Sequence, residues 1–498
     1  MIPLTVAEVA ATLGIVATGP GEPDAVVTAV SADSRQVGPG TLFVALPGER
    51  VDGHDYVAGA FDQGAVAALV VRPVPGARGQ QLVVADPLLA FGGLARHVVD
   101  RRHAEGLRVV GITGSRGKTS TKDLLAAVLT GAGPTVAPVG NLNNELGVPL
   151  TVVRVDAGTR FLVAEMGARG IGHIAYLCEI APPDVGVVLN VGHAHVGEFG
   201  GRAAIAQAKG ELVEALPDGG TAVLNADDPL VWAMRERTSA RVLPFAVDRA
   251  PEGPDAVWAE ALAGDDRGRY AFVLRTRRGG VEDRAPVRLR GTGRHQVGNA
   301  AAAAAAALAL GLDPETIAAA LSAAAPASRW RMEVRDRPDG VTVLNDAYNA
   351  NPDSMRAAVG TLAEIAGRRA ARSWAVLGDM LELGAEAESA HATLGRAVAA
   401  AGIDELVVLG AYAGTVAAAA AHGRSGVRVR VAGSKEEALS WLGAGLRAGD
   451  VVLVKASRGL ALDTVAADLL AARDVPPSAA DPTPSPDQDL HPREDRPA

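Results

Sequence analysis

The chain has 498 residues, a formal net charge of −9 and one cysteine. This length exceeds what a single hydrophobic core supports, so two to four domains are expected. One cysteine excludes an internal disulfide, the acidic balance argues against nucleic-acid binding, and no apolar run reaches the roughly 18 residues that cross a bilayer. We therefore expect a cytoplasmic protein without membrane insertion, in which Cys178 is a buried, small apolar residue.

Residues 1–105 predict a small α/β domain. The apolar runs at residues 41–46 and 67–71 predict strands, and residues 56–63 predict a helix between them. The Asp-Pro pair at residues 86–87 is typical of a helix start, and that helix should reach about residue 104.

Residues 111–120 read Gly-Ile-Thr-Gly-Ser-Arg-Gly-Lys-Thr-Ser, between a predicted strand at 109–112 and a predicted helix at 118–129. Glycines let the backbone fold tightly so that its N–H groups point at an anion, Lys118 adds positive charge, and the Thr119 hydroxyl suits Mg²⁺. The spacing departs from the usual phosphate-loop pattern because Ile112 stands where the first glycine would be. The strand before the loop and the helix after it argue against a chance glycine-rich turn. The residues predicted to hold ATP or a similar nucleotide are Gly114, Ser115, Arg116, Gly117, Lys118, Thr119 and Ser120.

The loop lies in a predicted central domain, residues 106–327. Continuous apolar runs at 161–166 and 185–191 predict strands buried on both faces, and helices at 171–178 and 202–216 separate them. This alternation predicts a parallel sheet, and hence a phosphate-loop ATPase domain. Residues 241–290 predict a small antiparallel appendage, and residues 296–310 an Ala-rich helix. We interpret the excess of alanine as a matter of composition, because alanine also crowds helices expected to be exposed.

Residues 328–474 repeat the alternation, with strands predicted at 341–344, 373–377, 405–409 and 451–454. This pattern predicts a third, doubly wound Rossmann-like domain. Residues 475–498 carry seven prolines and almost no apolar side chains, so a disordered tail is expected there.

Acidic and histidine side chains follow two of the central strands. Glu165 stands near the end of the first apolar run, and His193 and His195 follow the second. Ligands bind at the carboxyl ends of the strands in open α/β sheets, and carboxylates suit Mg²⁺. A solvent-facing acid is the alternative, but the neighbouring phosphate loop favours a metal ligand. Its strand-end position favours His195, and His193 stays undecided.

Other polar residues allow two interpretations each. Asp346, Tyr348 and Asn349 lie between a strand and a helix, where they fit either a binding site or a polar turn that caps the helix. Arg331, at the join between the second and third domains, fits either a phosphate contact across a cleft or an interdomain salt bridge. By composition, Lys209 is a solvated lysine on a helix surface.

Together these residues resemble the Mur ligases of peptidoglycan synthesis, over about residues 1–473. The matching motifs are the loop at 114–119, Glu165, Ala-His at 194–195, Ala-Lys-Gly-Glu at 208–211, Asn299, Arg-Met-Glu at 331–333 and Asp-x-Tyr-Asn-x-Asn-Pro at 346–352. Residues 33–35, 42–48 and 52–54 are similar to a UDP-sugar-binding domain of the family. Residues 140–149, 377–384 and 455–459 resemble the members that add D-alanyl-D-alanine. The Asp-Asn-Pro-Arg of the diaminopimelate-adding members is absent.

The resemblance implies three domains that close around the substrates UDP-N-acetylmuramoyl-tripeptide and D-alanyl-D-alanine, with ATP and two Mg²⁺ ions, in a monomer. It implies catalytic roles for Lys118, His195, Lys209 and Arg331, and a metal site of Thr119, Glu165, His195 and an N-carboxylated Lys209. Asn299, Asp346, Tyr348 and Asn349 would hold the nucleotide. The implied substrate-binding residues are Ser34, Arg35, Phe43, His54, Asn141, Asn143, Asn144, Asp379, Lys455, Ser457 and Arg458.

Three alternatives belong to other classes. A neighbouring ligase that adds a single amino acid or a polyglutamate is opposed by the 140–149 motif. A non-catalytic nucleotide-dependent regulator is opposed by the intact Lys118, Glu165, His195 and Lys209. A phosphate-loop motor or transporter ATPase is opposed by the lack of a membrane segment and of a convincing acidic partner motif.

Overall fold

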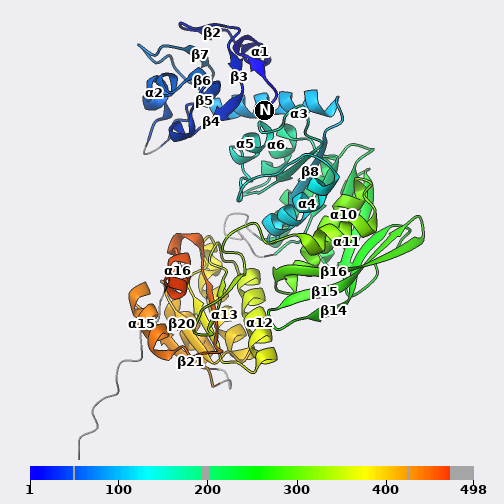
Figure 1. Cartoon of the computed structure of the whole chain (residues 1–498), viewed down its shortest axis with the longest axis vertical. Helices are drawn as coiled ribbons and strands as arrows, with labels where there is room; N and C mark the ends of the chain where they lie inside the picture. The colour runs from blue at the N-terminus through cyan, green and yellow to red at the C-terminus, as the bar shows by residue number, and fades with distance from the viewer. Residues whose placement is uncertain (49–50, 193–200, 423–425, 472–498) are drawn as a thin grey trace, which may run out of the picture.

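The computed structural model describes residues 1–48, 51–192, 201–422 and 426–471. Figure 1 shows three α/β bodies in chain order along the long axis, from the blue N-terminal body to the yellow and red C-terminal one. They contain a five-stranded, a nine-stranded and a six-stranded sheet, and a two-stranded sheet accompanies the first. The predicted fold class, three α/β domains with parallel sheets, is confirmed. No helix of the described residues is long and apolar enough to cross a membrane. The predicted disorder of residues 475–498 lies outside the described residues.

The N-terminal sheet has the strand order β2-β7-β6-β5-β4, parallel except for the β2–β7 pair. Its elements, with the β1–β3 ribbon, are β1 (Leu4–Thr5), α1 (Val6–Thr12), β2 (Ala17–Thr18), β3 (Val26–Val27), β4 (Ala29–Ser31), β5 (Thr41–Val44), α2 (Val57–Asp62), β6 (Ala65–Val70), β7 (Gln80–Val83) and α3 (Pro87–His103). Helix α3 begins as predicted, because the Asp86 carboxylate accepts hydrogen bonds from the N–H groups of Leu88 and Leu89.

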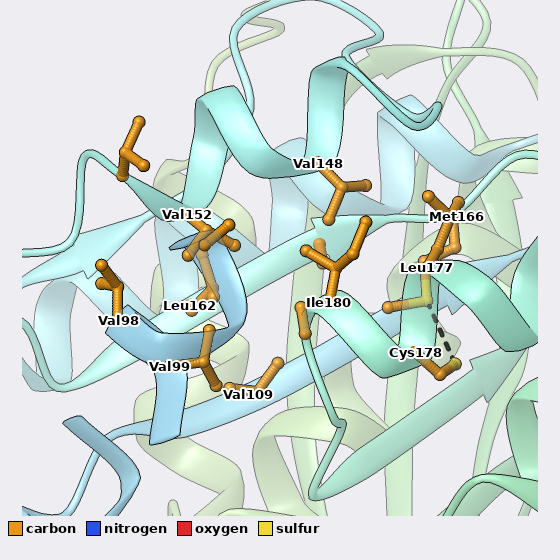
Figure 2. Packing of buried hydrophobic residues seen from close by; sticks show 14 of the residues in the cluster. Val98, Val99, Val109, Val148, Val152, Leu162, Met166, Leu177, Cys178 and Ile180 are labelled. Atoms are coloured by element: carbon orange, nitrogen blue, oxygen red, sulfur yellow. Dashed lines mark hydrogen bonds between the residues drawn. The ribbon is translucent and has the colours of Figure 1, made fainter. Parts of the chain in front are cut away.

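Helix α3 joins the first domain to the second through apolar contacts. Its Val98 and Val99 pack in one cluster with Val109, Leu162 and other side chains of the central domain (Figure 2). The same cluster reaches into the N-terminal sheet, so the two domains share one continuous core. Cys178 lies in it, with its Sγ 3.7 Å from the Met166 Sδ, and burial raises the pKa of its thiol to about 12. The prediction that Cys178 is a buried, small apolar residue is confirmed.

The central sheet has the order β16-β15-β14-β13-β12-β11-β8-β10-β9. Its strands are β8 (Arg108–Thr113), β9 (Thr135–Val136), β10 (Phe161–Glu165), β11 (Val185–Val188), β12 (Thr221–Asn225), β13 (Arg241–Val247), β14 (Ala256–Gly264), β15 (Arg269–Arg278) and β16 (Val281–Thr292). Its helices are α4 (Lys118–Ala132), α5 (Gly147–Val152), α6 (His173–Ile180), α8 (Arg202–Glu214), α9 (Pro229–Trp232), α10 (His295–Ala309) and α11 (Pro314–Ala323).

One expectation for the central domain is wrong. Residues 241–290 form no separate appendage, because β13 and β14 pair in parallel with the main sheet and only β15 and β16 turn antiparallel. The eight alanines at 300–307 of α10 are all fully buried. Their small side chains let α10 pack closely against both the sheet and α4, and this packing explains the alanine run.

The C-terminal sheet has the order β17-β18-β22-β19-β20-β21, parallel except at the edge strand β17. Its strands are β17 (Glu333–Asp336), β18 (Thr342–Asn345), β19 (Ser373–Leu377), β20 (Glu405–Val408), β21 (Arg428–Val431) and β22 (Val451–Lys455). Its helices are α12 (Pro352–Arg369), α13 (Ala387–Ala400), α14 (Ala413–Ala421), α15 (Lys435–Gly445) and α16 (Asp463–Ala471). The four predicted strands are present, and helix α12 follows β18 after a short polar loop.

Candidate nucleotide-binding and active site

The phosphate loop connects β8 to α4 and needs glycine at two positions. Gly117 has a φ of 85°, and a Cβ there would lie 2.5 Å from the Asn299 Oδ1. A Cβ on Gly114 would lie 2.8 Å from the Leu189 Cβ. Larger residues would therefore push the loop away from α10 and from the end of β11.

Asn190, which follows β11, fixes the loop from the side. Its Oδ1 accepts a hydrogen bond from the Arg116 N–H at 3.0 Å, and its Nδ2 donates to the Arg116 carbonyl at 3.1 Å. Its own carbonyl accepts from the Ser115 N–H at 3.1 Å. The sequence prediction did not include Asn190 as a site residue, although its position directly after a buried strand was the signal for it.

Lys118 begins α4 and is enclosed by the loop. Its Nζ donates to the Gly114 carbonyl at 2.7 Å. Burial lowers the pKa of Lys118, the Glu165 carboxylate opposes this shift, and the Arg331 guanidinium adds to it. The structure thus places the lysine charge inside the loop, beside one acidic and one basic side chain of the cavity.

Glu165 ends β10 beside the loop, because β10 and β11 both pair in parallel with β8. The side chain is buried; its Oε1 accepts a hydrogen bond from the Asn143 Nδ2 at 2.8 Å. Its Oε2 is buried with no hydrogen-bond partner among the described residues. An unpartnered carboxylate oxygen in the cavity that the buried Thr119 of the loop also lines fits a hard cation such as Mg²⁺. His193 and His195 lie outside the described residues, within which no three His, Cys, Asp or Glu side chains form a metal site.

Lys209 of α8 is not solvated. The residue is only 5% exposed and it lines the same cavity as Lys118. Burial, with a smaller contribution from the Lys118 charge, lowers the pKa of Lys209 well below its ordinary value. The interpretation from composition is therefore wrong. Burial favours an uncharged, nucleophilic amine at this position.

The C-terminal domain contributes residues from the segment before β17 and from the loop after β18. The Arg331 guanidinium stacks over the Tyr348 ring, 4.1 Å from its centroid. The Asp346 Oδ1 accepts a hydrogen bond from the Met332 N–H at 2.9 Å. Of the two interpretations of Arg331, the interdomain salt bridge is not observed among the described residues, and the side chain faces the cavity.

These parts enclose a cavity of about 580 Å³ between the central and C-terminal domains. The predicted residues that line it are Gly114, Ser115, Arg116, Gly117, Lys118, Thr119, Ser120, Asn141, Asn143, Asn144, Glu165, Lys209, Asn299, Arg331, Asp346, Tyr348, Asn349 and Lys455. Lining residues that the sequence prediction did not include as site residues comprise, among others, Asn190, Arg169, His173, His295 and Glu382. Residues from both sides of a domain junction thus converge on one site.

The predicted substrate residues of the N-terminal domain do not line this cavity. Ser34 and Arg35 lie in a short 3₁₀ turn, where exposed Arg35 pairs with Asp33 at 2.8 Å. The side chain of Phe43 is buried in the small core of this domain, so it offers no surface to a ligand. His54 is also buried, and both ring nitrogens have protein partners, the Asp52 carboxylate and the Val71 N–H. Direct contacts from Phe43 and His54 to a substrate are therefore not supported.

Three predicted substrate residues of the C-terminal domain are also engaged within the protein. The Asp379 carboxylate accepts from the N–H groups of Ala411 and Tyr412, and the Ser457 hydroxyl accepts from the Leu381 N–H. The half-exposed Arg458 pairs with Asp463 and stacks on Trp330, 4.4 Å from a ring centroid. These positions shape the loops near the cavity rather than line it.

Comparisons with known protein families match each of the three domains. Three family models match the chain: "Mur ligase family, catalytic domain" over residues 26–97, "Mur ligase middle domain" over 112–307, and "Mur ligase, glutamate ligase domain" over 330–458. A UDP-N-acetylmuramoyl-tripeptide–D-alanyl-D-alanine ligase from Mycobacterium tuberculosis is 46% identical, over 95% of this chain and 98% of its own length. The chain belongs to the Mur ligase family.

Further relatives of this Mur ligase extend the agreement. The ligase of the same name from Escherichia coli is 38% identical over 80% of the chain and 85% of its own length. The crystal structure of MurF from Acinetobacter baumannii superposes with a TM-score of 0.82 at 32% identity, covering 94% of this chain and 99% of that one. The MurF ligase of Thermotoga maritima in complex with ADP has a TM-score of 0.74 at 29% identity, covering 88% and 96%.

Proposed function

We propose that the protein uses ATP to join D-alanyl-D-alanine to UDP-N-acetylmuramoyl-tripeptide, which gives the pentapeptide precursor of peptidoglycan. The observation that carries the proposal is the cavity, in which a phosphate loop, a buried acid and a buried lysine face an arginine and a polar loop of the next domain. The substrate class comes from the relatives, which bear this activity in their names and match nearly the whole chain.

The reaction needs charge neutralisation and positioning. The tripeptide carboxylate attacks the γ-phosphate of ATP and releases ADP, and the acyl phosphate then reacts with the dipeptide amine and expels phosphate. Lys118 and the loop N–H groups would hold the phosphates, and Arg331 would meet the transferred group from the other domain. Asn299, Asp346, Tyr348 and Asn349 would hold the rest of the nucleotide. Because these groups come from two domains, closure would assemble the site.

Mg²⁺ belongs to this proposal. Glu165 and Thr119 would hold one ion, and the ion would neutralise the phosphate oxygens during transfer. A second ion would involve His195. The low pKa of Lys209 favours the free amine that reacts with carbon dioxide, which supports an N-carboxylated lysine as the anionic group there. Use of ATP and a UDP-linked precursor supports a cytoplasmic location.

The test is phosphate release by the purified protein with ATP, Mg²⁺, UDP-N-acetylmuramoyl-tripeptide and D-alanyl-D-alanine, each omitted in turn. We expect release only when all four are present, together with a pentapeptide product by mass spectrometry. Release with a single amino acid and a shorter acceptor would instead assign the protein to a neighbouring ligase. Nucleotide binding without release under any combination would favour a regulatory protein.

A further inference from the structure

Lys455, the last residue of β22, is committed to partners inside the protein. Its side chain is 3% exposed, and its Nζ lies 2.7 Å from the Asp346 Oδ2 and 2.8 Å from the Asn349 carbonyl. A third acceptor, the Asp346 carbonyl, lies at 3.3 Å. An ammonium group has three donors, so each has an acceptor within the loop after β18. Lys455 therefore keeps no donor for a substrate carboxylate, unlike the role that the sequence implies.

The second carboxylate oxygen of Asp346 holds the linker that enters the C-terminal domain, which is the segment of residues 330–332 before β17. Its Oδ1 accepts from the Met332 N–H at 2.9 Å, and the Tyr348 N–H donates to the Trp330 carbonyl at 3.2 Å. Trp330 and Met332 have φ angles of 58° and 50°, a left-handed conformation that side chains with a Cβ rarely adopt. Arg331 stands between these two strained residues. Its position at the cavity therefore depends on contacts that keep the linker in this conformation.

We propose that Lys455 is a positioning residue that places Arg331 through Asp346 and the linker. Lys455 fixes the Asp346 carboxylate, which holds the Met332 N–H, and the left-handed linker then sets the Arg331 guanidinium on the Tyr348 ring at the cavity. This inference rests on the proposed function, because it takes the cavity to be the ATP site. In this proposal Lys455 does not bind the dipeptide.

Removal of the Lys455 charge has a defined consequence. The Asp346 carboxylate, whose side chain is 14% exposed, would lose its cationic partner and turn toward water. The Met332 N–H would then lose a fixed acceptor, and the strained linker would relax. Arg331 would leave its place over Tyr348, so use of ATP should suffer while binding of the dipeptide should not.

The experiment compares Lys455→Met with the wild-type enzyme. Phosphate release is measured with ATP and D-alanyl-D-alanine varied separately. Calorimetry measures the binding of a non-hydrolysable ATP analogue, which keeps the γ-phosphate that Arg331 would meet. We expect kcat/KM for ATP to fall by about tenfold or more, in line with the loss of a charged hydrogen bond, and the KM for the dipeptide to stay within about twofold. A rise in the dipeptide KM with unchanged constants for ATP and its analogue would overturn the proposal.

Lys435→Met is the matched control. This lysine of the same domain also donates to a main-chain carbonyl, that of Ala461 at 2.9 Å, but it does not line the cavity. Its loss should leave the kinetic constants unchanged. If a thermal melt shows that Lys455→Met does not fold, Lys455→Gln, which keeps a donor, replaces it. We then expect a smaller fall in kcat/KM for ATP and again an unchanged KM for the dipeptide.

The variant Arg331→Met tests whether Lys455 acts through Arg331. In that background, Lys455→Met should lower kcat/KM for ATP by less than about threefold, because the group that Lys455 positions is already absent. An equal loss in both backgrounds would overturn the proposal. Lack of turnover by the wild-type enzyme would count against the proposed function alone, since the affinities of the variants for the ATP analogue still test the role of Lys455.

Discussion

The two domain junctions of this chain differ in kind. At the first, helix α3 belongs to an apolar cluster that includes side chains of both the N-terminal sheet and the central sheet. Figure 2 shows the part of this cluster between α3 and the central domain. At the second, the apolar clusters of the central and C-terminal domains are separate among the described residues. Polar contacts connect them instead: Tyr270 Oη to Glu364 Oε1 at 2.7 Å, Arg267 to Asp336 at 2.8 Å, and Ser328 Oγ to Asp123 Oδ2 at 2.6 Å.

This difference assigns separate tasks to the two junctions. Separation of an apolar interface costs a free energy of about 25 cal/mol for each Å² of apolar surface that becomes exposed. Separation of polar pairs has little net cost, because each group exchanges its partner for water. The second junction can therefore open and close at low cost, and the cavity lies there. The first junction should carry stability, and the second should carry chemistry and motion.

The largest effect should come from Lys118→Ala at the second junction. We expect kcat to fall by at least about 10²–10³-fold, because a preorganised positive group at the transferred phosphate is lost. The melting temperature should stay nearly unchanged, since the variant removes a charge whose burial is unfavourable and whose Nζ donates to a loop carbonyl. Phosphate release and circular dichroism melts measure the two effects. Lys118→Met, which keeps length without charge, should be equally inactive, and near-wild-type turnover in either variant would contradict the assignment.

Leu94→Ala should have the opposite profile at the first junction. Leu94 of α3 is fully buried in the shared cluster, and its truncation should lower the free energy of unfolding by about 2–5 kcal/mol. Turnover at low temperature should remain. Urea unfolding measures the change, and Leu89→Ala on the same helix, where the side chain is exposed, should change it by less than about 0.5 kcal/mol. Separate unfolding of the N-terminal domain would show that the core is not shared.

The sequence predicted the fold where apolar runs were continuous. Strands β8, β10 and β11 are buried on both faces, so hydrophobicity alone revealed them. Strand β7 was missed because it begins with Gln80 and Gln81. Both are buried, since their amide groups donate to the carbonyls of Gly21 at 2.8 Å and Val74 at 3.1 Å. Such pairing depends on distant segments that a local pattern does not contain.

The site was predictable where it followed a topological rule. Glu165 and Asp346 follow parallel strands, and the structure places both at the cavity. The burial of Lys209 and Lys455 was not predictable, because a lysine on a helix or at a strand end is exposed or enclosed according to the elements packed against it. His295 was missed for the same reason, since only the meeting of two domains surrounds it with charged groups.

At the second junction, His295 should make the free energy of unfolding moderately dependent on pH. Burial lowers the pKa of His295 to about 4, Arg116 and Lys455 add to the shift, and Asp346 opposes it. The unfolded chain, with a histidine pKa of about 6.5, binds more protons between those values, so stability should fall as the pH drops through this window. At pH 5 the loss should be about 1–2 kcal/mol relative to pH 7.

His295→Gln should remove most of that loss, as measured by denaturant unfolding at pH 7 and pH 5. The exposed His422 is the control, and His422→Gln should leave the pH dependence as in the wild type. An unchanged dependence in His295→Gln would place the titrating group elsewhere.

The smallest effects should differ in sign between the two junctions. Tyr270 at the second junction donates to the Glu364 carboxylate. Burial, and after it this carboxylate, raises the pKa of Tyr270 to about 12. Tyr176 lies near α3 at the first junction, and its buried hydroxyl has no hydrogen-bond partner among the described residues. Tyr270→Phe should therefore destabilise the protein by about 1 kcal/mol, because a hydrogen bond to a charged acceptor is lost. Tyr176→Phe should be neutral or slightly stabilising, because it removes an unsatisfied polar group from an apolar contact. The same substitution thus tests both junctions in parallel denaturant titrations, and equal losses in the two variants would show that the junctions do not differ as their contacts indicate.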